Sequence, residues 1–241
     1  MDGTERTALE QLLKDARAVL FDFDGPVTDL FRDESTAPVA AEIKKKVLGI
    51  WGHLDPDVEA CDDSHGILTH LSDMYDRPAA TPWDPRALKE AEAIVTEHEH
   101  AAVQSATLAP HVVRLVNALS RLGMRLVIVS NNADGPVREF LEKKNLRFDH
   151  VVGRDPNQLR LMKPNPSSVL RALKHLRLPP EEAFLIGDQL TDLRASQDAK
   201  TRFLGYTQSE ERAKEMREQK AYRVVRSHEP LIDAAVSLLR S

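Results

Sequence analysis

Short apolar runs that alternate with helical stretches are the feature of this 241-residue chain that most restricts its fold. The runs are rich in Val, Ile, Leu and Phe and lack the polar alternation of a strand with one face in solvent. They predict strands covered on both faces, as in a parallel sheet. The runs are Arg17–Phe21, Arg125–Val129, His150–Val152, Ala183–Ile186, Thr201–Leu204 and Tyr222–Val225.

Helical patterns separate these runs. One spans His111–Leu122 and a second spans Asp134–Leu141. A third begins at Asn165, which we expect to cap the helix, with Pro166 in the first turn. The alternation predicts the α/β class, with a Rossmann-like doubly wound parallel sheet as the core.

The interval from Arg32 to Ala109 breaks this alternation. It contains no convincing strand, and its periodic stretches at Ala40–Ile50, Gly66–Tyr75 and Arg86–Ala106 indicate helices. We therefore predict a small helical domain of residues 32–109, inserted after the first strand. The core would consist of residues 1–31 and 110–241.

Composition and charge exclude several classes of protein. The net charge is −5 with acidic and basic residues interspersed, so we expect neither a nucleic-acid nor a membrane partner. No run of about 18 apolar residues occurs, which argues against a membrane-spanning helix. Cys61 is the only cysteine, and the stretch Met1–Leu13 is charged and unlike a signal peptide. A cytoplasmic protein, monomeric or homodimeric, is the expectation.

Four short motifs carry the polar chemistry. Three lie at or just beyond the ends of predicted strands, and the lysine of the remaining one lies where a loop would enter a helix. Ligands of open parallel sheets gather at the carboxyl ends of the strands, so the motifs should meet in one crevice. The motifs are Phe21-Asp22-Phe23-Asp24-Gly25, Ser130-Asn131, Lys163-Pro164, and Gly187-Asp188 followed by Asp192.

The charges of these motifs do not balance. Asp22 and Asp24 are two residues apart, so their side chains point the same way if the backbone is extended. Like charges buried together repel unless a cation joins them or one of them is protonated. Asp188 and Asp192 add negative charge against Lys163. A bound Mg²⁺ ion would resolve the imbalance, because it prefers carboxylate oxygens and water.

The same residues suit phosphoryl transfer. An aspartate held against phosphorus can act as a nucleophile, and a second carboxylic acid can protonate the leaving oxygen. Ser130 and Lys163 would neutralise phosphoryl oxygens. Asn131 and Asn132 are either further donors to the substrate or residues of the turn before the next helix.

The four motifs resemble those of the haloacid dehalogenase superfamily, and the resemblance covers nearly the whole chain. Its first motif has the form Asp-x-Asp-Gly-Thr-x-x-Asp, which residues 22–29 match except that Pro26 replaces Thr. Proline removes a hydroxyl and an N–H group, so the hydrogen bonding of this turn must differ, and Thr28 is a candidate substitute. The insertion resembles the superfamily's helical cap, as in members similar to phosphoglycolate phosphatase.

The resemblance implies roles for individual residues. Asp22 would be the nucleophile and Asp24 the acid and base. Mg²⁺ would be held by the Asp22 side chain, the Asp24 carbonyl and Asp188. Asp192 would orient Lys163 or a metal-bound water.

The function that follows is hydrolysis of a small phosphorylated metabolite by a Mg²⁺-dependent phosphatase, through an aspartyl-phosphate. The alternatives are a sugar-phosphate mutase and a catalytically silent phosphate-binding sensor or scaffold. Dehalogenation is disfavoured, because the family's dehalogenating members lack the second aspartate that Asp24 supplies. Phosphonate cleavage would need a cap lysine as a Schiff base, and nothing marks Lys44, Lys45, Lys46 or Lys89 as desolvated.

Two further groups of residues in the insertion attract attention. The run Glu97-His98-Glu99-His100 looks like a metal cluster, but side chains two apart on a helix face different ways, so a solvated helix face is expected. Other side chains could form a specificity surface or could simply pack the insertion. They are Trp51, His53, His65, Arg77 and Trp83.

Overall fold

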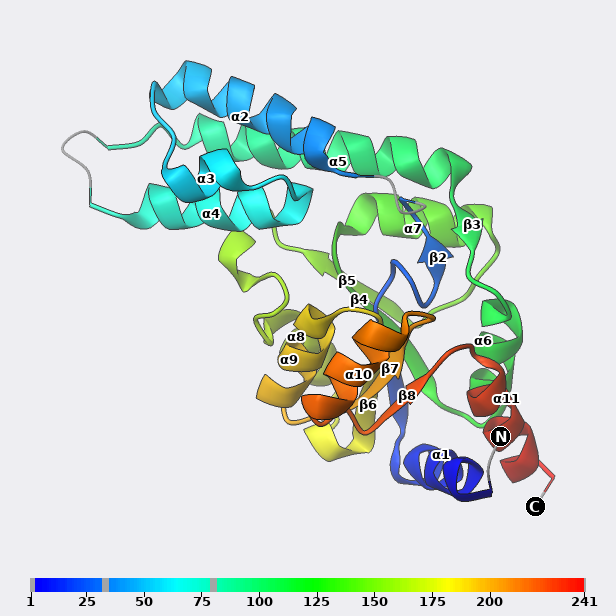
Figure 1. The fold of residues 1–241 in the computed structure, drawn as a ribbon. Coiled ribbons are helices and arrows are strands. Elements are labelled where there is room, and N and C mark those ends of the chain that lie inside the picture. The colour runs from blue at the N-terminus through cyan, green and yellow to red at the C-terminus, as the bar shows by residue number, and fades with distance from the viewer. Residues whose placement is uncertain (1–2, 32–34, 79–81, 241) are drawn as a thin grey trace.

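A six-stranded parallel sheet forms the centre of the computed structural model, which describes residues 3–31, 35–78 and 82–240 (Figure 1). The strand order is β5-β4-β1-β6-β7-β8, and every neighbouring pair is parallel. All six predicted strands are present, and the predicted α/β fold class is confirmed. The strands are β1 (Ala18–Phe21), β4 (Arg125–Ala133), β5 (His150–Arg154), β6 (Ala183–Gly187), β7 (Arg202–Tyr206) and β8 (Arg223–Val225).

Helices cover both faces of the sheet. Along β1, Val19 and Phe21 belong to one hydrophobic cluster, whereas Ala18 and Leu20 belong to another on the opposite face. This explains why the strands show no polar alternation. Helices on the first face are α1 (Gly3–Asp15), α6 (Val112–Arg121), α7 (Asp134–Lys143) and α11 (Glu229–Leu238); those on the second are α8 (Ser167–Leu176), α9 (Leu190–Asp198) and α10 (Glu210–Glu218).

The two ends of the described chain lie together, because α1 packs beside α11 (Figure 1). Helix α1 was not predicted, since its charged positions hide the buried Leu9, Leu12 and Leu13. The start of α8 differs by one residue from the prediction. Pro166 occupies the cap position, and Asn165, just before it, accepts a hydrogen bond at 3.0 Å from the main-chain N of Ser167.

The segment between β1 and α6 is mainly helical, as predicted, and its helices lie above the carboxyl ends of the strands (Figure 1). Its helices surround a hydrophobic cluster of their own. Leu159, in the short helix η1 (Leu159–Leu161), and Met162, the residue after that helix, also contribute to this cluster. No helix among the described residues is long and apolar enough to cross a membrane. The helices are α2 (Ala37–Trp51), α3 (Pro56–Ala60), α4 (Ser64–Asp76) and α5 (Arg86–Ser105).

Helix α5 connects this segment to the sheet. Its first half contributes Ala91 and Val95 to the cluster of the α2–α5 segment, and its last turns contribute Val103 to the core of the sheet. A helix of 20 residues is about 30 Å long, which is enough to span both. One face of α5 therefore reaches the strand ends.

The prediction that residues 32–109 contain no strand is wrong at one point. Strand β2 (Thr28–Asp29) pairs antiparallel with β3 (Thr107–Leu108), and the Thr28 hydroxyl donates to the Thr107 carbonyl at 2.8 Å. Two-residue strands are too short to show periodicity. The predicted boundary at Arg32 lies outside the described residues.

Candidate active site

The motif residues meet at the end of β1. The chain adds β4 and β5 on one side of β1 and then β6, β7 and β8 on the other, so β1 lies at the switch point of the sheet. Asp22 follows β1, Ser130 lies in β4, and Asp188 follows β6, the two neighbours of β1. The main-chain N of Asp22 donates to the Ile186 carbonyl at 2.8 Å, which fixes the end of β1 against β6. Strands far apart in sequence thus bring their end residues together, as predicted.

Lys163 is fully enclosed among these carboxylates. Its Nζ lies 2.6 Å from Oδ1 of Asp22 and 2.6 Å from Oδ1 of Asp192, and it donates to the Val129 carbonyl at 3.1 Å. The two ion pairs raise the pKa of Lys163 against the opposing effect of burial. The lysine therefore stays charged and joins two aspartates from different elements.

Asn131 holds the main chain of Lys163. Its Oδ1 accepts from the Lys163 main-chain N at 2.7 Å, and its Nδ2 donates to the Lys163 carbonyl at 3.1 Å. These contacts belong to neither interpretation of Asn131, as a substrate donor or as a residue of the turn before the next helix: they position the lysine loop and leave one amide hydrogen over.

Ser130 and Asn132 are buried and bonded to each other. The Ser130 hydroxyl donates to Asn132 Oδ1 at 2.9 Å and accepts from the Asn132 main-chain N at 3.1 Å. The Nδ2 amide group of Asn132 is buried and has no hydrogen-bond partner among the described residues. Asn132 lines the cavity described below. Such a donor is costly unless a ligand satisfies it.

Asp24 occupies a different environment from Asp22. Its Oδ1 accepts from the Leu30 main-chain N at 2.8 Å, and burial raises the pKa of its carboxyl. The turn that follows Asp24 depends on Gly25, which has φ +90°. A Cβ atom there would lie 2.6 Å from Cγ of Asp188, so only glycine allows this approach.

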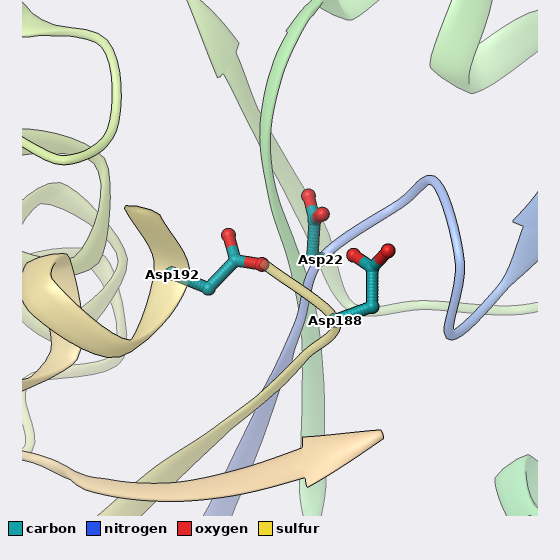
Figure 2. Close-up of side chains that lie close together, drawn as sticks. All are labelled: Asp22, Asp188 and Asp192. Atoms are coloured by element: carbon teal, nitrogen blue, oxygen red, sulfur yellow. The ribbon is translucent and has the colours of Figure 1, made fainter. Parts of the chain in front are cut away.

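Three carboxylates form a cluster with oxygens within 4.8 Å of one another: Asp22, Asp188 and Asp192. Figure 2 shows Asp22 and Asp188 pointing to the same side beyond their strands, with Asp192 reaching in from the start of α9. Burial, and then the charge of Asp192, raises the pKa of Asp22 to about 7 and that of Asp188 to about 8. The site holds more negative charge than Lys163 neutralises.

This donor set fits a hard divalent cation. The oxygens of Asp192 are already engaged, with Oδ1 at Lys163 and Oδ2 accepting from the Gln189 main-chain N at 3.0 Å. Asp22 and Asp188 are therefore better placed for a cation. Asp192 contacts the lysine, and its role in orienting Lys163 stays a prediction.

A cavity of about 610 Å³ lies over this cluster, between the strand ends and helix α4. Asp22, Lys163 and Asp188 contribute to the wall on the strand side, and Ser64, His65, Thr69 and His70 contribute to the wall formed by α4. Both walls thus present polar groups that can bind a hydrophilic ligand, beside apolar side chains such as Phe31 and Met162.

Among the five candidates for a specificity surface, all within the described residues, only His65 lines this cavity. The rings of Trp51 and Trp83 contact each other at a tilt, with centroids 5.1 Å apart, and both pack in the cluster of the α2–α5 segment. His53 and Arg77 both pair with Asp55.

Glu99 corrects the expectation of a solvated face at residues 97–100, because it is fully buried. It pairs with Arg154 and His65, whereas its neighbours turn elsewhere: His98 Nε2 lies 3.1 Å from Glu42 and His100 Nδ1 2.6 Å from Glu139. The two histidines therefore have different partners. No local pattern marks Arg154, because Glu99 lies 55 positions away in the chain.

His228 is a second residue that sequence patterns missed. Its Nε2 lies 2.7 Å from the Pro26 carbonyl, and its ring stacks on Tyr206 with centroids 4.4 Å apart. Burial lowers the pKa of His228 to about 4, so the ring is neutral and Nε2–H is the donor. Thr28, the suggested substitute for the missing threonine, directs its hydroxyl to Thr107 instead.

The chain matches the model of the family described as haloacid dehalogenase-like hydrolase over residues 19–206. It therefore belongs to this family, and the predicted resemblance and hydrolase class are confirmed. Phosphoglycolate phosphatase of Aquifex aeolicus is 28% identical over 190 residues, which cover 77% of this chain and 82% of that protein.

Solved structures agree with the fold. A predicted phosphatase from Clostridium acetobutylicum superposes with a TM-score of 0.62 at 19% identity, covering 94% of this chain and 99% of that one. CbbY from Rhodobacter sphaeroides, solved in complex with phosphate, has a TM-score of 0.57 at 21% identity, covering 88% and 94%. The same α/β architecture therefore recurs in both proteins.

Proposed function

We propose that the protein is a Mg²⁺-dependent phosphatase that hydrolyses a small phosphorylated metabolite through an aspartyl-phosphate intermediate. The observation that carries the proposal is the buried pair of Asp22 and Lys163 beside Asp188 on the wall of the 610 Å³ cavity. A carboxylate, an ammonium group and a hydroxyl in one water-restricted site suit a phosphoryl group. The similarity to a phosphoglycolate phosphatase supports a phosphate monoester as substrate.

In the first step, the Asp22 carboxylate attacks phosphorus, and the bond from phosphorus to the ester oxygen breaks. Asp24 gives its proton to the leaving oxygen. Burial raises the pKa of Asp24, which favours the protonated form that this step needs. In the second step, Asp24 takes a proton from water as the water oxygen attacks phosphorus, which releases phosphate and regenerates Asp22.

Lys163 and the unpartnered Nδ2 amide group of Asn132 would contact the phosphoryl oxygens, with the spare amide hydrogen of Asn131 as a further donor. Ser130 would join them once its hydroxyl hydrogen turns away from Asn132 Oδ1. Asp22, Asp188 and the Asp24 carbonyl would hold Mg²⁺. When bound, Mg²⁺ supplies positive charge that lowers the pKa values of these carboxyls and offsets the charge of the phosphoryl group.

Residues 32–109 would act as a cap over a core of residues 1–31 and 110–241. The position of α4 across the cavity supports this division, because a lid must face the reacting groups. Closure would exclude bulk water. A cytoplasmic location and a monomeric or homodimeric state stay predictions from the sequence.

The test is phosphate release by purified protein from phosphoglycolate, glycerol phosphate, a hexose phosphate and phenyl phosphate, with Mg²⁺ and with a chelator. We expect turnover of at least one ester that chelator abolishes and added Mg²⁺ restores. A protein that releases no phosphate from any of them, or that works equally well without metal, would contradict the proposal. Isomerisation of the hexose phosphate without release would favour the mutase, and phosphate binding without turnover would favour the sensor.

A further inference from the structure

Glu99 stands at the centre of a buried polar network that the phosphatase mechanism above does not use. Its Oε1 lies 2.7 Å from Arg154 Nη1 and 2.9 Å from His65 Nε2. Its Oε2 accepts from the Ala133 main-chain N at 2.9 Å. We call these four residues the Glu99 network.

The Glu99 network joins the cavity to the sheet. His65 belongs to α4 and Glu99 to α5, whereas Ala133 and Arg154 end β4 and β5. Arg154 also donates at 2.8 Å to the carbonyl of Asn131, the residue whose side chain holds the main chain of Lys163. A contiguous chain of hydrogen bonds thus runs from the lysine loop to the wall of the cavity on α4.

The charge of Glu99 determines which ring nitrogen of His65 carries the hydrogen of their hydrogen bond. Burial acts against ionisation of Glu99, but the hydrogen bond from His65 and the charge of Arg154 outweigh it and hold the pKa of Glu99 at about 2. An ionised carboxylate only accepts, so His65 Nε2 carries the hydrogen. Nδ1 is then the ring nitrogen that remains for a ligand: without a proton it accepts from a hydroxyl, and with a proton it donates to a carboxylate.

The position of His65 suggests which part of a substrate it meets. The ring lines the cavity on the side of α4, opposite the Asp22–Lys163 pair. Asp24 lines the same cavity. Asp24 is the residue that would protonate the leaving oxygen.

We propose that His65 contacts an oxygen of the leaving group, a hydroxyl or a carboxylate, and that Glu99 and Arg154 are positioning residues that aim its ring. This inference rests on the proposed phosphatase function and adds a determinant of its substrate. A phosphate ester whose leaving group has no oxygen beyond the ester atom would gain nothing from His65.

The test compares His65→Gln with the wild type, because Gln retains an N–H group near the position of Nε2 and lacks Nδ1. The probes are phenyl phosphate, which has no further oxygen, and whichever of glycerol phosphate, phosphoglycolate and the hexose phosphate has the highest kcat/KM. We expect kcat/KM for the oxygen-bearing ester to fall about tenfold, mainly through KM, and that for phenyl phosphate to change less than about twofold. Preference for glycerol phosphate or for phosphoglycolate identifies the oxygen as hydroxyl or carboxylate.

Glu99→Gln should give the same selective rise in KM, and the double variant with His65→Gln should be no worse than either single variant, since both act through one contact. His98→Gln is the matched control, because His98 pairs through Nε2 with Glu42 at 3.1 Å but does not line the cavity. Its kinetics should match those of the wild type. Thermal melting identifies any variant that fails to fold. If Glu99→Gln fails to fold, His65→Gln alone provides the test.

Equal losses for both esters, or wild-type kinetics in folded His65→Gln, would overturn the inference and leave the phosphatase function standing. The same selective loss in His98→Gln would also overturn it. A wild-type protein inactive on every ester would overturn the phosphatase function itself, and this inference with it.

Discussion

Lys163 Nζ lies 2.6 Å from Oδ1 of Asp22, although 141 positions separate the two residues in the chain. The contact places a permanent positive charge against the carboxylate that we propose as nucleophile. The same ammonium group lies 2.6 Å from Asp192, so one cation serves two buried anions. This shortage of positive charge determines how the site should respond to mutation, metal and pH.

Asp22→Asn should abolish phosphate release while leaving the fold intact, because the amide oxygen is a poor nucleophile. Burial and the charge of Asp192 raise the pKa of Asp22 to about 7, so the ionised carboxylate is a source of strain in the metal-free protein. We therefore expect the melting temperature of Asp22→Asn without metal, at pH 8, to equal or exceed that of the wild type. Normal turnover by a folded Asp22→Asn protein would show that Asp22 is not the nucleophile.

Asp188→Asn should weaken the response to Mg²⁺. The variant removes one of the two carboxylates best placed to hold the ion, so the Mg²⁺ concentration for half-maximal activity should rise at least about tenfold. Titration of activity with Mg²⁺ measures this directly. Asp198→Asn, at the exposed end of α9, is the control. Identical Mg²⁺ titrations for Asp188→Asn and wild type would remove Asp188 from the metal site.

Much of the fold could be predicted because strand periodicity is local. The buried runs at β1 and β4 are apolar on both faces, so a few residues suffice to identify them. Helix α1 was missed because Glu10 and Gln11 lie between its buried leucines and charged residues flank them, which weakens the apolar pattern. The β2–β3 pair escaped because two-residue strands exist only through their partner.

The site divides in the same way. Asp22, Ser130, Lys163 and Asp188 occur in short motifs at strand ends, so sequence alone could bring them together. The role of Asn131 depends on where the main chain of Lys163 passes, which no local pattern encodes. Glu99 resembled a solvated residue because it lies in the polar run of residues 97–100, and its burial depends on partners from β4 and β5.

Metal-free protein should lose stability as pH rises from about 6.5 to 8.5. The pKa values of Asp22 and Asp188 in the folded state are about 7 and about 8, above the value of about 4 for an unfolded Asp. The folded state therefore binds more protons in this range, and its stability falls as those protons are lost. Mg²⁺ should raise the melting temperature more at pH 8.5 than at pH 6.5. A melting temperature of chelated protein that is flat or rising across this range would contradict the pKa assignments.

The last prediction concerns the turn that follows the nucleophile, where Pro26 departs from the family motif. His228 donates from Nε2 to the Pro26 carbonyl at 2.7 Å and is almost completely buried. Replacing it with Leu leaves a buried carbonyl without its donor, which costs about 1–3 kcal/mol. For a chain of this size, a loss of about 2 kcal/mol lowers the melting temperature by roughly 4–8 °C.

His228→Gln separates this hydrogen bond from the packing of the ring on Tyr206, because Gln keeps an N–H donor near the position of Nε2. We expect His228→Leu to lower both the melting temperature and kcat, since the turn carries Asp24 and Gly25 beside Asp188. His228→Gln should recover a substantial part of both losses. If Gln and Leu are equally impaired, the stacking on Tyr206, with ring centroids 4.4 Å apart, supports the turn and the hydrogen bond to Pro26 does not.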